Sequence, residues 1–375
     1  MSVPLSPMGF PASPAPPANV PMRWLLEHGA PPIQYRALAE LDALPDAPPG
    51  VPLDLLPYTH PQAVRLVMGH AWDGSGPGGM LGVPRTKGAV ETAGTMLAVR
   101  RLLEYGWTRD APPLHRARRA LFRLLAEDSD PNFLYDLAAD AGSDEMLIAR
   151  GRRILRAAAA ATLAQAGYAE DPRLRGAAHR ATTRATTYLA SSLAEDPWVK
   201  ARDGVALDEE ATPPSMYLLL MLSHMPLFRT EHQTAMDALY EYVSRPRPTQ
   251  GTRQWVGTRV VDQSHLVLGD WFPDMASVMA DLPGALLWLE TMARLGFLRR
   301  NEGWSGLLDQ LLDQRDASGI WHAPGGESPP SMPNDPLTWP IYPIEARQSG
   351  EKCWTDVTFR LALIARLAGR TLEPA

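Results

Sequence analysis

The stretch Leu102-Leu-Glu-Tyr-Gly106-Trp107-Thr-Arg-Asp110-Ala-Pro112-Pro113 carries the signals of one helix ending and another beginning. Glycine relieves strain at a left-handed helix end, and the apolar residue after it packs back on the helix. An Asp just ahead of prolines caps the free amides of the next helix. We therefore expect a helical hairpin here, that is, two helices joined by a short turn.

The same arrangement recurs about every sixty to seventy residues. Each later copy has a helix end, a turn and a cap. The second copy has Leu163, Gly167-Tyr168 and Asp171 in these places, and the third has Leu222, Pro226-Leu227 and Thr230. The fourth has Met292, Gly296-Phe297 and Asn301. Helix pairs repeated in this way cannot bury both faces alone, so their neighbours must stack. The repeat predicts an all-α fold, either an open solenoid or a closed ring.

Helical periodicity dominates the chain after a Pro-rich leader, residues 1–21, which we expect to be flexible and not a signal peptide. Strand-like alternation is scarce. The longest runs without proline are 87–107, 143–168, 173–195, 230–244 and 284–299, and the long connectors are 72–86, 196–213, 247–273 and 319–355. Because these connectors hold much of the Gly, Pro and Trp, we expect them to crowd one mouth of a ring.

Composition excludes several classes of function. The net charge of −6 argues against a broad nucleic-acid surface, which needs a surplus of Lys and Arg. The single cysteine, Cys353, excludes an intrachain disulfide framework and any multi-thiolate metal site. No apolar stretch is long enough for a membrane span. We expect a cytoplasmic protein without a cofactor.

Three segments resemble a known superfamily. Gln314-Arg-Asp-Ala-Ser-Gly319-Ile-Trp321 is similar to the Gln-to-Gly-x-Trp core of the squalene cyclase repeat, although the usual preceding aromatic is missing. Trp24-Leu-Leu-Glu27 with Pro31-Pro-Ile-Gln-Tyr35, and the closing Trp354-Thr-Asp356-Val-Thr-Phe359, resemble the two ends of bacterial proteins labelled prenyltransferase-like or squalene-cyclase-like. The resemblance implies one α/α-toroid domain over residues 22–370, followed by a tail, 371–375.

The superfamily contains cyclases, prenyltransferases, glycan-cleaving enzymes and non-catalytic modules, so the resemblance alone does not assign an activity. The Asp-x-Asp-Asp acid of type II cyclases and the Asp-Asp-x-x-Asp motif of metal-dependent terpene synthases are both missing. Glu351-Lys-Cys353 stands where prenyltransferases hold zinc, but no His follows it. We therefore expect no metal, and Cys353 to be a small apolar residue.

Two further clusters have structural interpretations. In the acidic cluster Asp136, Asp140, Asp144 and Glu145, the last two are expected to stabilise a helix start, whereas Asp136 and Asp140 could be functional. The glycines Gly74, Gly76, Gly78 and Gly79 lack the Gly-Lys-Ser/Thr ending of a phosphate loop. They predict a structural loop.

The remaining candidates are loop aromatics beside acids or His. We expect Asp73, Asp270 and His265 to be the polar groups of a central cavity, with Asp270 or Asp73 as proton donor if an acid-initiated reaction occurs. The candidate ligand-binding residues are Trp72, Trp271, Trp304, Trp339, Tyr342, Trp354 and Asp356. About two in three of the loop Trp residues should simply pack the mouth of the barrel.

Three functions remain open at this stage. The first is binding of an apolar or mixed-polarity, isoprenoid-like small molecule in a central cavity, with catalysis possible. The second is glycan cleavage by a carboxylate pair beside Trp platforms. The third is a non-catalytic interaction scaffold that binds a protein partner.

Overall fold

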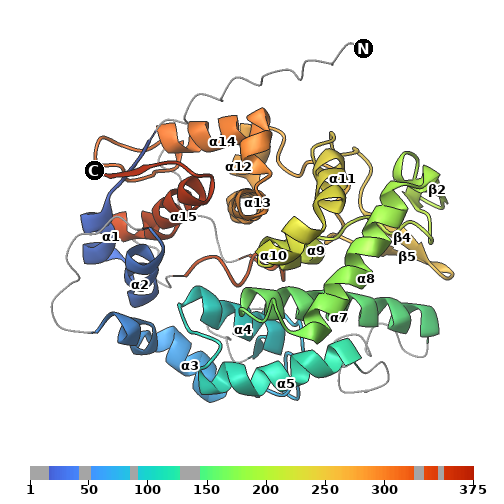
Figure 1. Cartoon of the computed structure of the whole chain (residues 1–375), viewed down its shortest axis with the longest axis horizontal. Coiled ribbons are helices and arrows are strands. Elements are labelled where there is room, and N and C mark those ends of the chain that lie inside the picture. The colour runs from blue at the N-terminus through green and yellow to red at the C-terminus, as the bar shows by residue number, and fades with distance from the viewer. Residues whose placement is uncertain (1–16, 42–51, 85–91, 127–143, 325–332, 345–349) are drawn as a thin grey trace, which may run out of the picture.

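The computed structural model of the chain is mostly helical (Figure 1). It describes residues 17–41, 52–84, 92–126, 144–324, 333–344 and 350–375. Within these ranges the helices are α1 (Met22–His28), α2 (Pro31–Glu40), α3 (Pro61–Gly69), α4 (Thr95–Glu104), α5 (Pro112–Ala126), α7 (Glu145–Gln165), α8 (Pro172–Leu189), α9 (Met216–Ser223), α10 (Pro226–Glu231), α11 (Gln233–Val243), α12 (Met275–Ala280), α13 (Leu282–Leu295), α14 (Glu302–Asp313) and α15 (Thr355–Leu367). Short 3-10 turns are η1 (Leu53–Thr59), η4 (Ser192–Ala194), η5 (Leu298–Arg300) and η7 (Glu351–Trp354).

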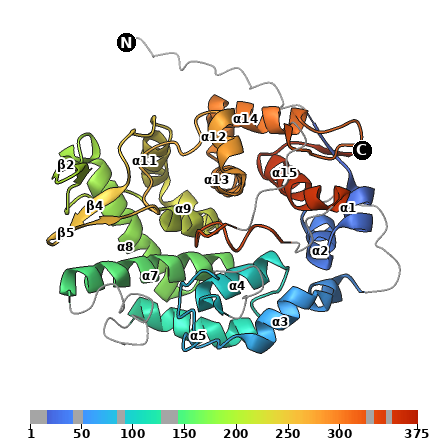
Figure 2. The same cartoon turned by 180° about the vertical axis from the view of Figure 1, so that it is seen from behind.

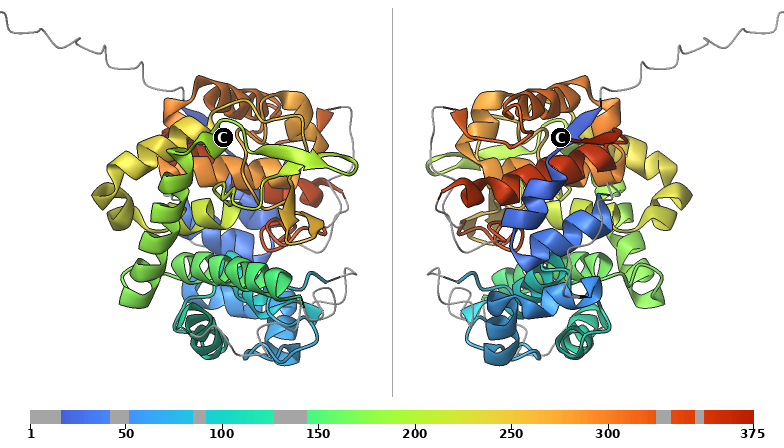
Figure 3. Two further views of the ribbon diagram at one scale, coloured as in Figure 1. Left: turned by 90° about the vertical axis from the view of Figure 1, so that its right-hand side faces the viewer. Right: turned by 90° about the vertical axis from the view of Figure 1, so that its left-hand side faces the viewer.

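The helices follow one another around the molecule in a single circuit (Figure 1). Helices α4 and α7, α7 and α9, α9 and α13, and α13 and α15 are in contact in turn. Helix α15, late in the chain, packs against α1 and α2, which are early in it (Figure 3, right). Helices α5, α8 and α14 flank this series: α5 contacts α4 and α7, α8 contacts α7 and α9, and α14 contacts α15.

The glycine turns predicted from the repeat are confirmed. Gly106, Gly167 and Gly296 all have positive φ, and the amides of Trp107, Tyr168 and Phe297 donate to the carbonyls of Leu102, Leu163 and Met292. These are the six-to-one hydrogen bonds of Schellman helix ends. Asp171 and Asn301 cap the following helices, as expected.

The third copy of the repeat differs from the prediction. Thr230 does not cap the second helix, because it lies inside α10 and its hydroxyl donates to the carbonyl of Pro226. Helix α11 begins after His232, whose side chain makes no cap. The predicted turn residues Pro226 and Leu227 are the first two residues of α10, so the turn after α9 lies earlier, at His224 and Met225.

The expectation of an all-α fold is only partly right, because two small sheets are present. One has four strands in the order β2 (Trp198–Ala201), β3 (Gly204–Leu207), β4 (Arg253–Val256) and β5 (Arg259–Asp262). Its two hairpins come from the connectors 196–213 and 247–273, and they join through Leu207 opposite Gln254. Each strand is only four residues long, which is why alternation in the sequence is weak.

The second sheet joins the two ends of the described chain. Strand β1 (Ala18–Val20) runs parallel to β6 (Leu372–Pro374), with Ala18 opposite Leu372. Ala18 and Val20 are fully buried. The expected leader and tail therefore each contribute a strand, and this pairing lies beside α15.

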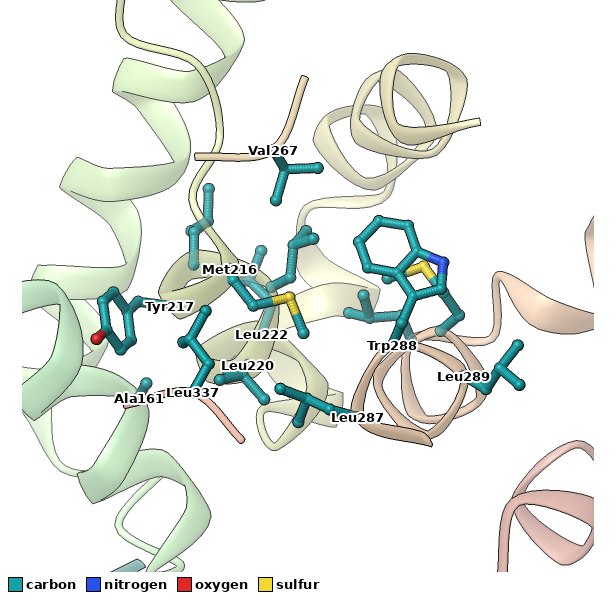
Figure 4. Packing of buried hydrophobic residues seen from close by; sticks show 14 of the residues in the cluster. Ala161, Met216, Tyr217, Leu220, Leu222, Val267, Leu287, Trp288, Leu289 and Leu337 are labelled. Carbon is teal, nitrogen blue, oxygen red and sulfur yellow. The ribbon is translucent and has the colours of Figure 1, made fainter. Parts of the chain in front are cut away.

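The largest side chains pack into a core between the inner helices. Figure 4 shows part of it, where Met216, Leu220 and Leu222 of α9 face Leu287 and Trp288 of α13. Trp288 stacks on Trp271 with ring centres 5.5 Å apart and meets the edge of Trp304 at 5.8 Å. Such aromatic pairs contribute about 1 kcal/mol each beyond their buried area.

A buried network of charges connects four of these helices. Arg36 of α2 donates to Glu104 of α4 at 2.6 Å, Arg360 of α15 also donates to Glu104, and Arg360 reaches Glu290 of α13 at 2.8 Å. Burial by itself raises the pKa of Glu104, but Arg360 and Arg36 outweigh it and hold that pKa well below its ordinary value. Glu104 is therefore a carboxylate that depends on both arginines.

The first prediction concerns the glycine turns. Gly296→Ala forces a Cβ into a left-handed backbone without meeting a neighbour, so we expect a loss of about 1 to 2 kcal/mol in the free energy of unfolding. Gly106→Ala should lose more, because its Cβ would also lie 2.4 Å from Tyr35. Gly306→Ala, inside α14 with open space around it, should instead stabilise by up to about 1 kcal/mol. Urea denaturation measures all three, and equal effects at Gly106 and Gly306 would contradict the turn geometry.

The second prediction concerns the charge network. Glu104→Gln leaves Arg36 and Arg360 without their shared carboxylate, and we expect a loss of about 3 to 5 kcal/mol in unfolding free energy. The pKa of Glu104 is lower in the folded protein than in the unfolded chain. The ionised Glu104 therefore contributes its full stabilisation of the fold above the unfolded pKa of about 4.3, and this contribution is lost as pH falls further. The exposed pair Arg23–Glu27 is the control, and Glu27→Gln should leave stability unchanged. Denaturation midpoints at pH 7 and pH 4 compare the two variants.

Candidate functional site

The centre of the helical circuit is filled by the chain itself. Residues 333–344 cross it between α4, α9 and α15 (Figures 1 and 2). Arg100 donates to the carbonyls of Pro336 and Leu337, and Arg101 to those of Pro340 and Pro343. Beside this segment remains a polar cavity of about 20 Å³. That volume holds about one water molecule.

Asp73 and Asp270 each have a local structural role. Asp73 is exposed and accepts hydrogen bonds from the hydroxyl and the amide of Ser75, which lower its pKa. Asp270 is half-buried and accepts from the amide of Phe272 at 3.0 Å, and burial raises its pKa. They lie in separate connectors and are not brought together.

The seven candidate ligand-binding residues fall into separate packing groups instead of one pocket. Trp72 is buried and donates to the carbonyl of Val67. Trp271 and Trp304 flank Trp288 in the core. Trp339 and Tyr342 belong to the segment 333–344, where the guanidinium of Arg101 lies over the ring of Trp339. Trp354 meets Trp321 edge-on. Buried Asp356 accepts a hydrogen bond from the backbone amide of Ile344. The expectation that many of these rings pack the protein fits this arrangement.

The acidic and glycine clusters are structural where the structure describes them. Asp144 caps α7 by accepting from the amides of Met146 and Leu147, and Glu145 is the first residue of that helix. Asp136 and Asp140 lie outside the described residues. A Cβ on Gly78 would lie 2.1 Å from the carbonyl of Thr92, so this loop needs glycine for close packing of its backbone.

Cys353 is half-buried against the core, and burial raises the pKa of its thiol. Its placement fits the expected role of a small packed side chain. Within the described ranges, no group of three His, Cys, Asp or Glu side chains is arranged to hold a metal ion.

A large cavity lies to one side of the filled centre, between α7, α8, the start of α9 and the four-stranded sheet. Its volume is about 690 Å³, which is within the range of small-molecule sites. His265 is the one sequence-predicted site residue on its wall. The described lining residues are Leu125, Ala126, Arg150, Arg153, Ile154, Arg156, Ala157, Ala160, Ala177, Arg180, Ala181, Arg184, Ala185, Glu209, Ala211, Thr212, Pro213, Pro214, Ser215, Tyr217, Leu218, Met221, Gln254, Gln263, His265 and Leu266.

The helical period explains the wall made by α7 and α8. On α8 the lining residues are Ala177, Arg180, Ala181, Arg184 and Ala185, which are three or four positions apart and share one face. The alanines leave space between the helices because their side chains are too short to fill it. The arginines on the same face reach the edge of that space, and α7 repeats the pattern.

Hydrogen bonds of the backbone position the opposite wall. The amide of Met216 donates to the carbonyl of His265, and that of Val267 to Pro214, which holds the segment after β5 against the start of α9. Two side chains add to these backbone bonds. The side-chain amide of buried Gln263 donates to the side-chain oxygen of Gln254, and the side-chain amide of Gln254 donates to the backbone carbonyl of Ala211. Tyr217, Leu218 and Met221 of α9 form an apolar floor that is almost fully buried.

The cavity carries a strong excess of positive charge. Arg150, Arg153, Arg156, Arg180 and Arg184 line it, whereas Glu209 is the carboxylate among its described lining residues. Burial, followed by repulsion from Arg184, lowers the pKa of Arg153. Burial, followed by Arg153, lowers that of Arg150. Glu209 opposes the shift of Arg153 and Asp262 that of Arg150, so the repulsion along this wall is partly offset.

Sequence reasoning missed these arginines, although a signal was present. Arg150 and Arg153 on one helix and Arg180 and Arg184 on the next alternate with alanine at helical spacing. Such a pattern is also typical of an ordinary solvated face, and only the packing of α7 and α8 against α9 makes it concave. The Trp-rich connectors were more conspicuous, but Trp72, Trp321, Trp339 and Trp354 are buried core residues.

No protein-family model, curated protein or solved structure matches this chain. The site must therefore be interpreted from its own residues. Among the helices in the described ranges, none combines the length and the apolar character needed to cross a membrane.

The third prediction concerns His265. Burial, followed by the charge of Arg150, lowers its pKa to about 4, while Asp262 opposes the shift. Between the unfolded pKa of about 6.5 and pH 4, the unfolded chain binds a proton that the folded chain refuses, so stability falls as pH drops through this window. His265→Asn should remove the part of this pH dependence of stability that comes from His265. The imidazole resonance, assigned by its loss in this variant, should titrate near pH 4; titration above pH 6 would refute the burial.

Proposed function

We propose that the protein is an α/α-toroid-like, small-molecule-binding protein whose ligand, of mixed polarity, occupies the cavity between α7, α8 and α9. The observation that carries the proposal is the cavity itself, which combines an apolar floor with a polar rim. The ligand was expected in a central cavity, but the centre is filled by residues 333–344 and the proposal moves to this lateral site.

The toroid part of the proposal rests on the single circuit of helices and on the return of α15 to α1 and α2. The pairing of β1 with β6 favours a closed ring over an open solenoid, because a solenoid would keep its ends apart. Kinship with the terpenoid cyclase and prenyltransferase superfamily remains a proposal that rests on the sequence resemblance.

The other functions have less support at this cavity. Glycan cleavage needs two carboxylates facing each other across the bound sugar, and the described lining offers Glu209 as its carboxylate. A pure interaction scaffold would not need a cavity of about 690 Å³. The lining also holds the hydroxyls of Ser215 and Thr212, but no hydrogen bond among the described residues joins either of them to His265 or Glu209, so no catalytic group is assigned.

The fourth prediction tests binding in the cavity. The neutral fluorophore N-phenyl-1-naphthylamine should bind saturably at one site, because its rings match the floor of Tyr217, Leu218 and Met221. Ala181→Phe places a large side chain in the cavity and should weaken binding at least about tenfold. Fluorescence titration measures both dissociation constants.

Ala149→Phe is the matched control, since Ala149 is exposed on α7 and does not line the cavity. It should leave the dissociation constant unchanged. Equal binding to the native protein and to Ala181→Phe, with both folded by circular dichroism, would place the fluorophore elsewhere and end the proposal.

A further inference from the structure

The arginines of the cavity differ in how their charges are compensated. The guanidinium of Arg150 donates to the carbonyl of Asp262 at 2.7 Å. In contrast, Arg153, Arg180 and Arg184 form no ion pair and no hydrogen bond with any residue that the structure describes. Three solvent-exposed guanidinium groups therefore stand at one rim without a protein hydrogen-bond partner among the described residues.

These three arginines converge from two helices. Arg153 comes from α7, and Arg180 and Arg184 lie one turn apart on α8. Arg153 and Arg184 are close enough for repulsion to lower the pKa of Arg153. All three arginines are exposed, and Glu209 on the same lining opposes the lowering of the pKa of Arg153. The rim therefore gathers three guanidinium groups at one cavity, with Glu209 as the described carboxylate beside them.

The chemistry of the guanidinium group indicates what would compensate it. Each guanidinium offers five N–H donors in a planar fork, and one fork is enough for a carboxylate. A phosphate monoester carries a charge of about −1.5 to −2 and three peripheral oxygens, so it can accept from several forks at once. A doubly charged anion therefore suits three arginines better than a carboxylate does.

The rest of the cavity indicates what the anion is attached to. Inside the rim the wall is alanine, with Ala160 and Ala185 buried, and the floor is Tyr217, Leu218 and Met221. An inorganic ion would leave this apolar surface and most of the volume unused. An ester with an apolar chain would cover it and exclude water.

We propose that the cavity binds an amphipathic phosphate ester, whose phosphate is held by Arg153, Arg180 and Arg184 and whose apolar chain lies on the floor formed by α9. The proposal rests on the proposed function, because it assigns the head group of a ligand in the same cavity. It concerns binding alone and involves no chemical step.

The fifth prediction uses ligands that share a chain and differ in their head group. Octyl phosphate should bind at least about tenfold more tightly than octanoate, octanol or inorganic phosphate, because it alone combines a doubly charged head group with an apolar chain. Its affinity should also fall as salt rises. Isothermal titration calorimetry measures all four compounds, with octyl phosphate kept below its micelle concentration.

Arg180→Gln and Arg184→Gln should each weaken octyl phosphate binding at least about tenfold and change octanol binding less than about threefold. Arg202→Gln is the control, because Arg202 is exposed, carries the same charge and lies away from the cavity. Without ligand, Arg184→Gln should unfold at an equal or higher temperature than the native protein, because it removes repulsion from Arg153. A variant that binds octyl phosphate more weakly but is as stable as the native protein has lost the binding contact and not the fold.

The outcomes separate the two proposals. If octanol or the neutral fluorophore binds in the cavity and octyl phosphate binds no more tightly, the head-group assignment is wrong and the proposed function stands. If inorganic phosphate binds as tightly as octyl phosphate, the inference that the ligand carries an apolar chain is wrong. If no compound binds and Ala181→Phe changes nothing, both proposals are wrong.

Discussion

The fold depends on a carboxylate shared between two arginines that come from opposite ends of the chain. Glu104 on α4 accepts from Arg36 on α2 and from Arg360 on α15, and Arg360 continues to Glu290 on α13. A buried ion pair seldom adds much net stability, but one charge left alone is very costly. The network therefore favours the arrangement in which all four helices are present together, and it excludes partial assemblies in which one is missing.

The same centre determines where a ligand can be held. Arg100 and Arg101, which neighbour Glu104 on α4, bind the carbonyls of residues 336–343 and keep that segment across the middle of the circuit. The space that a ring of helices would otherwise enclose is thus occupied by backbone and by Trp339 and Tyr342. The larger cavity lies instead where alanines on α7 and α8 keep those helices from filling the space beside α9.

The sequence predicts best what local chemistry determines. Gly106, Gly167 and Gly296 mark helix ends because a positive φ and a six-to-one hydrogen bond involve only a few neighbouring residues. Strands β2 to β5 were missed because they are short and become a sheet only when Leu207 meets Gln254, far along the chain. For the site, Trp and Asp in the connectors were conspicuous but serve packing and turns, whereas the arginine rim depends on how α7, α8 and α9 meet. His265 was predicted for a central cavity and lies instead on the lateral one, because its connector bends back onto α9.

The short pairing of β1 with β6 has a consequence for how the protein is made. It joins residues that are far apart in the sequence, so bringing them together carries the entropic cost of closing a very long loop. During synthesis, Ala18 must wait for Leu372 to leave the ribosome, and the buried positions of Ala18 and Val20 stay open to water until then. Pairing of β1 with β6 is therefore expected late in folding, after the local turns at Gly106, Gly167 and Gly296 have formed.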